Sequence, residues 1–107
     1  MTKLNLKKEV DFVKGNVYSI CMRGARRFET DEFDIYIYTP NNVDKPKEIA
    51  DIVSQSNYIF SDIIPKDYSD NYDTSARTMH GLYRAMIDAY PSFEEREIVT
   101  ILRFRIL

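Results

Sequence analysis

Residues 33–39, which read FDIYIYT, restrict the fold of this chain more than any other segment. Along this segment apolar side chains occupy every second position, so that an extended chain would place Ile35 and Ile37 on one side and Tyr36 and Tyr38 on the other. A period of two is typical of a β-strand that buries one of its faces. We therefore expect a sheet whose apolar face is covered by a second layer.

Two further segments predict strands of the same sheet. Residues 17–22 are rich in β-branched and aromatic side chains, and their modest connection to residues 33–39 favours an antiparallel hairpin between the two. Residues 98–106 close the chain with a period of two, in which Leu102, Phe104 and Ile106 alternate with arginines. With one uncertain segment at residues 58–64, the sequence predicts three to four strands.

Apolar side chains spaced for a helix mark two main segments. The stronger one begins with a cap at Thr74 or Ser75, repeats apolar residues at three- and four-residue steps, and ends before Pro91. The second is predicted over residues 44–57, where an aspartate and a proline precede three apolar residues at helical spacing, Ile49, Ile52 and Val53. A short helix is also expected over residues 5–14, on the spacing of Leu6, Val10 and Val13.

Together these segments predict an α+β fold, with a small antiparallel or mixed sheet of three to four strands covered on one face by two helices. The chain has 107 residues and no linker-like tract, which predicts a single compact domain over residues 1–107. Its single cysteine permits no internal disulfide, and the basic N-terminal stretch is not followed by an apolar segment. Without a run long enough to span a membrane, we expect a cytoplasmic protein.

Few residues suggest catalytic chemistry. The only histidine, His80, and the only cysteine, Cys21, are too few for a zinc site of the usual kind, and no glycine-rich phosphate-binding loop is present. The acidic loop over residues 65–73 has oxygen ligands but lacks the spacing and the glycine of a calcium loop, so we interpret it as a solvated turn with a weak cation site as the alternative. The sequence therefore predicts no catalytic residue, no metal and no cofactor.

The surface residues of interest are aromatic and basic. If the last strand lies near the hairpin, Tyr36 and Tyr38 share one side of the sheet with Arg103 and Arg105. Tyrosine and arginine are enriched at protein-binding hot spots, and rings beside arginines also suit the stacking of unpaired bases. In a third interpretation these side chains only cover the sheet and keep it soluble. The partner-binding prediction also includes the arginines that follow the first strand, Arg23, Arg26 and Arg27.

Three hypotheses for function follow. The first is a non-enzymatic protein-binding module, of the kind that phages and mobile elements use to modulate or inhibit a host protein such as a defence nuclease. The second is a nucleic-acid-binding domain that uses the arginine and tyrosine face of the sheet. The third is an enzyme with an unrecognised site around His80. The near-neutral net charge of −2 argues against a bulk polycation, so any basic surface must be local. Separately, an edge of the long helix could pack on a second copy of the chain.

Overall fold

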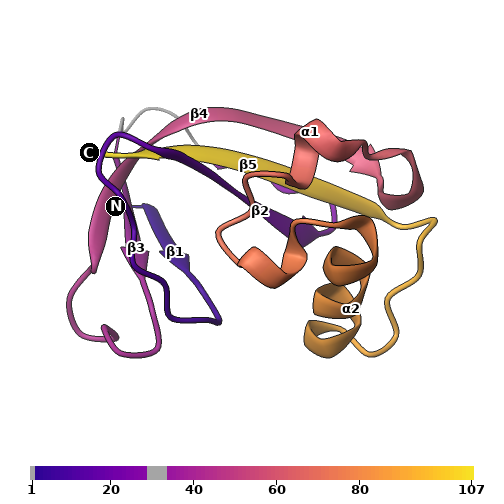
Figure 1. Ribbon diagram of the computed structural model, residues 1–107, viewed down its shortest axis with the longest axis horizontal. Helices are drawn as coiled ribbons and strands as arrows, with labels where there is room; N and C mark the ends of the chain where they lie inside the picture. The colour runs from indigo at the N-terminus through magenta and orange to yellow at the C-terminus, as the bar shows by residue number, and fades with distance from the viewer. Residues whose placement is uncertain (1, 29–33) are drawn as a thin grey trace.

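A computed structural model describes residues 2–28 and 34–107 of the chain (Figure 1). The regular elements are five strands, two α-helices and two short 3-10 helices. In chain order they are β1 (Thr2–Asn5), β2 (Val17–Arg23), β3 (Asp34–Tyr38), β4 (Glu48–Ile59), η1 (Phe60–Asp62), α1 (Pro65–Tyr68), η2 (Thr74–Ala76), α2 (Met79–Ala89) and β5 (Ile98–Ile106). None of the helices among these residues is of a length and apolarity that would cross a membrane.

The strands form one mixed sheet in the order β1-β3-β4-β5-β2. β1 runs parallel to β3, and the other neighbouring strands are antiparallel. The prediction of an α+β fold with a mixed sheet and two helices is confirmed, but the number of strands was too low, since the sheet has five. β1 was missed because it is four residues long and buries a single side chain, that of Leu4, which leaves no alternation to detect.

The helix predicted over residues 44–57 is wrong, because this segment forms β4. A β-bulge between Ile52 and Ser54 inserts one extra residue, so that Ile52 and Gln55 face the same side of the sheet although they lie three positions apart. Of the residues on which the helix was predicted, Ile49 and Ile52 face opposite sides of the sheet and Val53 lies in the bulge, so their helical spacing reflects no shared face. The short helix expected over residues 5–14 is also absent, and Val13, one of its three marker residues, is exposed.

The predicted hairpin between the first two strong strands is wrong as well. β2 pairs with β5, and β3 lies between β1 and β4 on the other side of the sheet. The long helix is confirmed, although it begins later than predicted, with Thr78 as its N-cap, and its C-cap is Tyr90. α1, the other helix, is a single turn over residues 65–68, within the segment predicted as a loop.

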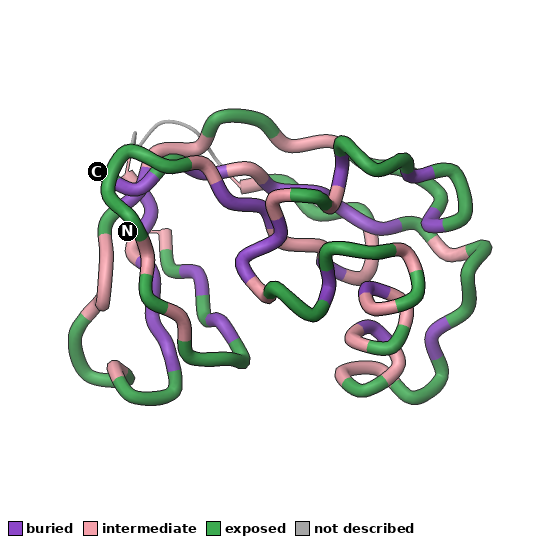
Figure 2. The backbone as a smooth tube through the Cα atoms, viewed as in Figure 1, coloured by how far each residue is buried: buried purple, intermediate pink, exposed green. Residues whose placement is uncertain are grey.

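Buried residues occur along the strands and in α2 (Figure 2), and they form two apolar clusters. Leu102, Phe104 and Ile106 of β5 belong to one apolar cluster, which the irregular segment after β1 covers. Val99 points to the other face and packs in a second cluster with Leu82 of α2. The expectation that two helices cover one face is therefore wrong. Instead, α2 covers one end of one face, and the irregular segment after β1 covers the other face.

Gly81, in the first turn of α2, allows this helix to approach the preceding segment closely. A Cβ atom on Gly81 would lie 1.9 Å from the main-chain carbonyl oxygen of Ser75. We expect Gly81→Ala to lower the free energy of unfolding by about 3 kcal/mol, because overpacking outweighs the better helix propensity of alanine. Urea denaturation measures this change, with His80→Ala at the neighbouring exposed position as the control. A loss no greater than that of the control would contradict the close approach.

Candidate ligand-binding cavity between the sheet edges

A cavity of about 570 Å³ lies where the two edge strands of the sheet and α2 come together. Three consecutive residues of β1, residues 3–5, and three of β2, residues 20–22, line it. Successive side chains of a strand point to opposite faces, so a cavity that contacts three in a row meets the strand at its edge. In Figure 1, β1 and α2 extend from the same side of the β4–β5 ribbon. The cavity therefore occupies the opening between the two edges of the sheet.

The lining combines positive charge with aromatic rings. Lys3, Lys7 and Arg26 line the cavity, are exposed, and form no ion pair with any residue that the structure describes. The ammonium group of Lys7 lies 4.8 Å from the ring centroid of Tyr90, which holds it at the cavity by a cation–π contact. Aromatic and apolar lining residues include Phe28, Tyr72, Tyr90, Leu82 and Met86. The one opposing charge without an ion pair among the described residues is the exposed carboxylate of Asp88.

Lys8 also lines the cavity, but its charge is bound to the neighbouring segment. Its Nζ lies 2.9 Å from Oδ2 of Asp73 and 3.3 Å from Oγ of Ser75, and the Ser75 hydroxyl donates to Asp73 over 2.7 Å. The hydrogen bond to Asp73 raises the pKa of Lys8, so this lysine stays protonated and cannot serve as a base for the serine. The trio joins the N-terminal segment to the start of η2 and so fixes one wall of the cavity.

The charge of Asp73 should be visible in the pH dependence of stability. Burial tends to raise the pKa of Asp73, but hydrogen bonds from Lys8 and Ser75 outweigh burial and hold the pKa below its ordinary value of 3.8. A carboxylate with a lowered native pKa stabilises the fold above its unfolded pKa, and this stability is lost as the pH falls through the native pKa. We expect Asp73→Asn to lower the free energy of unfolding by about 0.5 kcal/mol at neutral pH, since asparagine keeps the cap but loses the charge.

Urea denaturation of both proteins at neutral pH and at about pH 2.5 measures this difference. The gap between the two proteins should narrow at the acidic pH, because the stabilising charge of Asp73 is lost as the pH falls through its native pKa. A gap of equal size at both values would mean that the carboxylate charge adds nothing to stability.

Cys21 is the one potential nucleophile of β2 at the cavity. Burial raises the pKa of its thiol to about 12, so the thiolate is scarce at neutral pH. The side chain packs against the apolar cluster below α2. This setting is that of an unreactive thiol.

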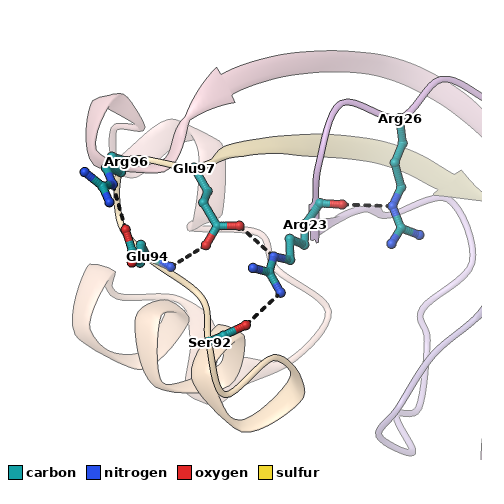
Figure 3. Close-up of polar contacts among 6 residues, drawn as sticks. All are labelled: Arg23, Arg26, Ser92, Glu94, Arg96 and Glu97. Carbon is teal, nitrogen blue, oxygen red and sulfur yellow. Dashed lines mark hydrogen bonds and ion pairs between the residues drawn. The ribbon is translucent and has the colours of Figure 1, made fainter.

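The three predicted arginines that follow β2 have different roles, and Figure 3 shows the contacts of Arg23 and Arg26. Nε of Arg23 donates to Oε1 of Glu97 over 2.6 Å, and its guanidinium carbon lies 5.6 Å from the ring centroid of Tyr90. Arg26 lines the cavity, and its Nε donates to the main-chain oxygen of Arg23 over 3.0 Å. Arg27 is exposed and does not line the cavity. Of the three, Arg26 is the one that lines the cavity, and its charge has no ion-pair partner among the described residues.

The other predicted residues lie outside the cavity. Strand register places Tyr36, Tyr38, Arg103 and Arg105 on one side of the sheet, as the alternation indicates. Tyr38 is buried beneath the ammonium group of Lys3, which lies 5.3 Å from its ring centroid. Arg103 is held by Asp70, at 3.1 Å, and by the main-chain oxygen of Lys66. Tyr36 is half-buried and Arg105 is exposed, so these two remain accessible.

The remaining candidate residues have local roles. His80 is exposed on α2 and does not line the cavity. In the acidic loop, Asp67 accepts from the main-chain N–H of Ile64 over 2.9 Å, and Asn71 accepts from that of Asp73 over 2.9 Å. Among the described residues, no group of three or more acidic, histidine or cysteine side chains is arranged to hold a metal ion.

Several cavity residues escaped the sequence analysis. Lys3 and Lys7 belong to a basic N-terminal stretch that contains no motif, and Tyr72 lies in a segment predicted as a solvated loop, although it is buried. Tyr90 was assigned to the helix stripe, where it serves as the C-cap beside Lys7 and Arg23. The position of Tyr90 at the end of the predicted helix, next to Pro91, was the one sign in the sequence that this end of α2 could contribute to a binding site.

Comparisons with known proteins bear on the fold. No protein-family description matches the sequence, and no curated protein matches it. Among solved structures, the chain is similar to the crystal structure of an ASCH domain from Lactobacillus crispatus JV V101, with a TM-score of 0.67 and 9% sequence identity. The similarity covers 98% of this chain and 79% of that chain. At this level of identity, the comparison supports the arrangement of helices and strands and nothing more specific.

Proposed function

We propose that this protein binds single-stranded nucleic acid at the cavity between β1, β2 and α2. The observation that carries the proposal is the lining, which brings the charges of Lys3, Lys7 and Arg26, without ion-pair partners among the described residues, together with aromatic and apolar side chains. Proteins that bind unpaired strands combine cations, which follow the phosphates, with rings and apolar surface, on which bases stack. The nucleic-acid hypothesis from the sequence is thus kept, but it moves from the open side of the sheet to its edges.

The charge distribution favours a local contact over a long track. The whole chain carries a net charge of −2, so phosphates far from the cavity would meet a weakly repulsive protein. The three lining cations without an ion-pair partner among the described residues correspond to about three phosphate contacts and so to a shallow dependence of affinity on salt. A short unpaired segment fits this footprint better than a duplex.

Fluorescence anisotropy of labelled eight-nucleotide RNA and DNA strands tests the proposal. Binding should be measurable at about 20 mM KCl and should weaken by roughly 10- to 100-fold at about 200 mM. A duplex of the same length serves as the control and should bind more weakly than either single strand. If neither the RNA nor the DNA oligonucleotide binds at the lower salt concentration, the proposal that the protein binds single-stranded nucleic acid is wrong.

A second candidate function keeps the protein-binding hypothesis, and one observation favours it. Ile59 of β4 and Ile98 of β5 lie directly opposite each other and are 43% and 49% exposed. Exposed apolar side chains that touch one another are a common feature of protein contact sites. A modulator or inhibitor of a host protein would use such a patch, and this function stays a prediction. Pull-down with wild-type protein and with Ile59→Lys, from the native host, compares the bound proteins directly.

A further inference from the structure

The geometry points to a specific ligand group for the cavity: one unpaired nucleobase, whose hydrogen-bonding edge pairs with free main-chain groups of the two edge strands. This inference rests on the proposed function, because it states which part of the nucleic acid enters the cavity. The main-chain groups concerned are the N–H and C=O of Cys21 on β2 and those of Lys3 and Asn5 on β1.

The pairing of β2 leaves Cys21 free at the outer edge. The N–H of Ser19 donates to the main-chain oxygen of Asp70 over 2.9 Å, and the oxygen of Ser19 accepts from the N–H of Tyr72 over 2.9 Å. Ser19 therefore directs both of its main-chain groups away from β5. In an antiparallel pair this direction alternates, so Cys21, two residues later, also points outward. Asp70 and Tyr72 cover this edge at Ser19, but no described residue forms a main-chain hydrogen bond with Cys21 at the same edge.

β1 presents the complementary edge. The N–H of Leu6, just after β1, donates to the main-chain oxygen of Tyr38 over 2.9 Å, so Leu6 points toward β3. In a parallel ladder the direction again alternates along the chain, which turns the main-chain groups of Lys3 and Asn5 away from β3. Both residues line the cavity. The cavity thus has main-chain donors and acceptors of two strands on its walls, and groups of this kind can hydrogen-bond a polar ligand.

The length of the free edge decides which ligand fits. The segment Asp70–Tyr72 covers β2 at Ser19, and Nε of Arg26 donates to the main-chain oxygen of Arg23. Between these two contacts Cys21 is the one residue whose outward N–H and C=O both lack a partner among the described residues, which is too short for an added peptide strand, since strand addition uses several residues in a row. One donor and one acceptor side by side match the edge of a base. Apolar side chains of α2, Leu82, Ala85 and Met86, offer its faces a surface, and Lys7 and Arg26 stand at phosphate positions.

Cys21→Pro and Cys21→Ala form a matched pair for the test. Proline removes the N–H of Cys21 and places ring carbons in its position, and a proline is tolerated on an edge strand where the N–H faces outward. Alanine removes the thiol but keeps the N–H. Because the two variants share the loss of the thiol, their difference reports the N–H, and we expect Cys21→Pro to bind the eight-nucleotide oligonucleotide about tenfold more weakly than Cys21→Ala. Thermal unfolding of both variants verifies the fold.

If the proline variant fails to fold, hydrogen exchange of the wild-type protein gives the same information. The amide of Cys21 should exchange faster than those of Ile20 and Met22 in the free protein, and should become protected when the strand binds. A strand with abasic sugars at every position completes the test, and it should bind at least tenfold more weakly than the intact strand.

The outcomes separate this inference from the proposed function. If the abasic strand binds as tightly as the intact strand, or if the Cys21 amide gains no protection, nucleic acid binds through phosphates alone and the inference is wrong while the proposed function stands. If no strand binds, both are wrong. If an extended peptide protects the Cys21 amide and no oligonucleotide does, the cavity binds a protein ligand, and both the inference and the proposed function are wrong.

Discussion

Replacing Lys7 and Arg26 together by glutamate is expected to weaken binding of a single-stranded oligonucleotide by roughly 100-fold at low salt. Both side chains line the cavity, and neither is neutralised by an ion pair within the described residues. The substitution removes two phosphate contacts and introduces two repelling charges. The slope of log affinity against log salt should also fall by about two, because two fewer counterions are released.

The matched control is the pair Lys14→Glu and Lys45→Glu. These lysines are exposed and lie outside the cavity lining, and the control changes the net charge by the same amount. It should retain most of the affinity, because only the long-range field changes. Equal losses in the two variants would show that net charge governs binding, and the cavity would no longer be the candidate site.

Replacing Phe104 by alanine is expected to lower the free energy of unfolding by about 4 kcal/mol. The side chain is fully buried at 0% exposure in the cluster that the irregular segment covers. Its ring lies 6.2 Å from that of Phe12, in an edge-to-face contact, and 6.3 Å from that of Tyr18. A cavity at this position would remove contacts with both the sheet and its cover, so that neither can collapse into the space cheaply.

Urea denaturation monitored by circular dichroism measures the loss, with Ile49→Ala as the control. Ile49 is an aliphatic residue of β4 that is 38% exposed, and its truncation should cost less than about 1 kcal/mol. A small domain has only about 5–15 kcal/mol in total, so the Phe104 variant is expected to be partly unfolded at 37 °C. A cost below that of the control would mean that the irregular segment does not pack as described.

The sequence predicted β3, β5 and α2 well because the period of each is read directly from its side chains. β5 covers residues 98–106 as expected, since a uniform alternation survives when no residue is inserted. β4 was mistaken for a helix because the bulge at Ile52 and Ser54 breaks its alternation. Pairing is a further step, which a single sequence does not encode locally. β2 and β5 are separated by most of the chain, and residue composition does not distinguish this partner from the nearer β3.

The candidate site was predicted in part. Arg26 and the idea of rings beside cations came from the sequence, whereas Lys3, Lys7 and Tyr72 reach the cavity only through long-range contacts. Tyr38 illustrates the opposite error. Alternation places Tyr38 on the side of the sheet that was expected to be open, but it is buried there, with the ammonium group of Lys3 over its ring. Exposure depends on what other segments cover, and local spacing carries no information on that.

The cover that Asp70–Tyr72 places over β2 has a consequence for the behaviour of the protein in concentrated solution. An exposed strand edge is a template on which the strands of other molecules can assemble, and soluble proteins blunt such edges. Here one edge is shielded beside Ser19, and the other ends in a short strand that carries Lys3. If the 70–72 segment detached from β2, the uncovered edge would extend from Cys21 to Ser19, and other molecules could add strands to it and aggregate.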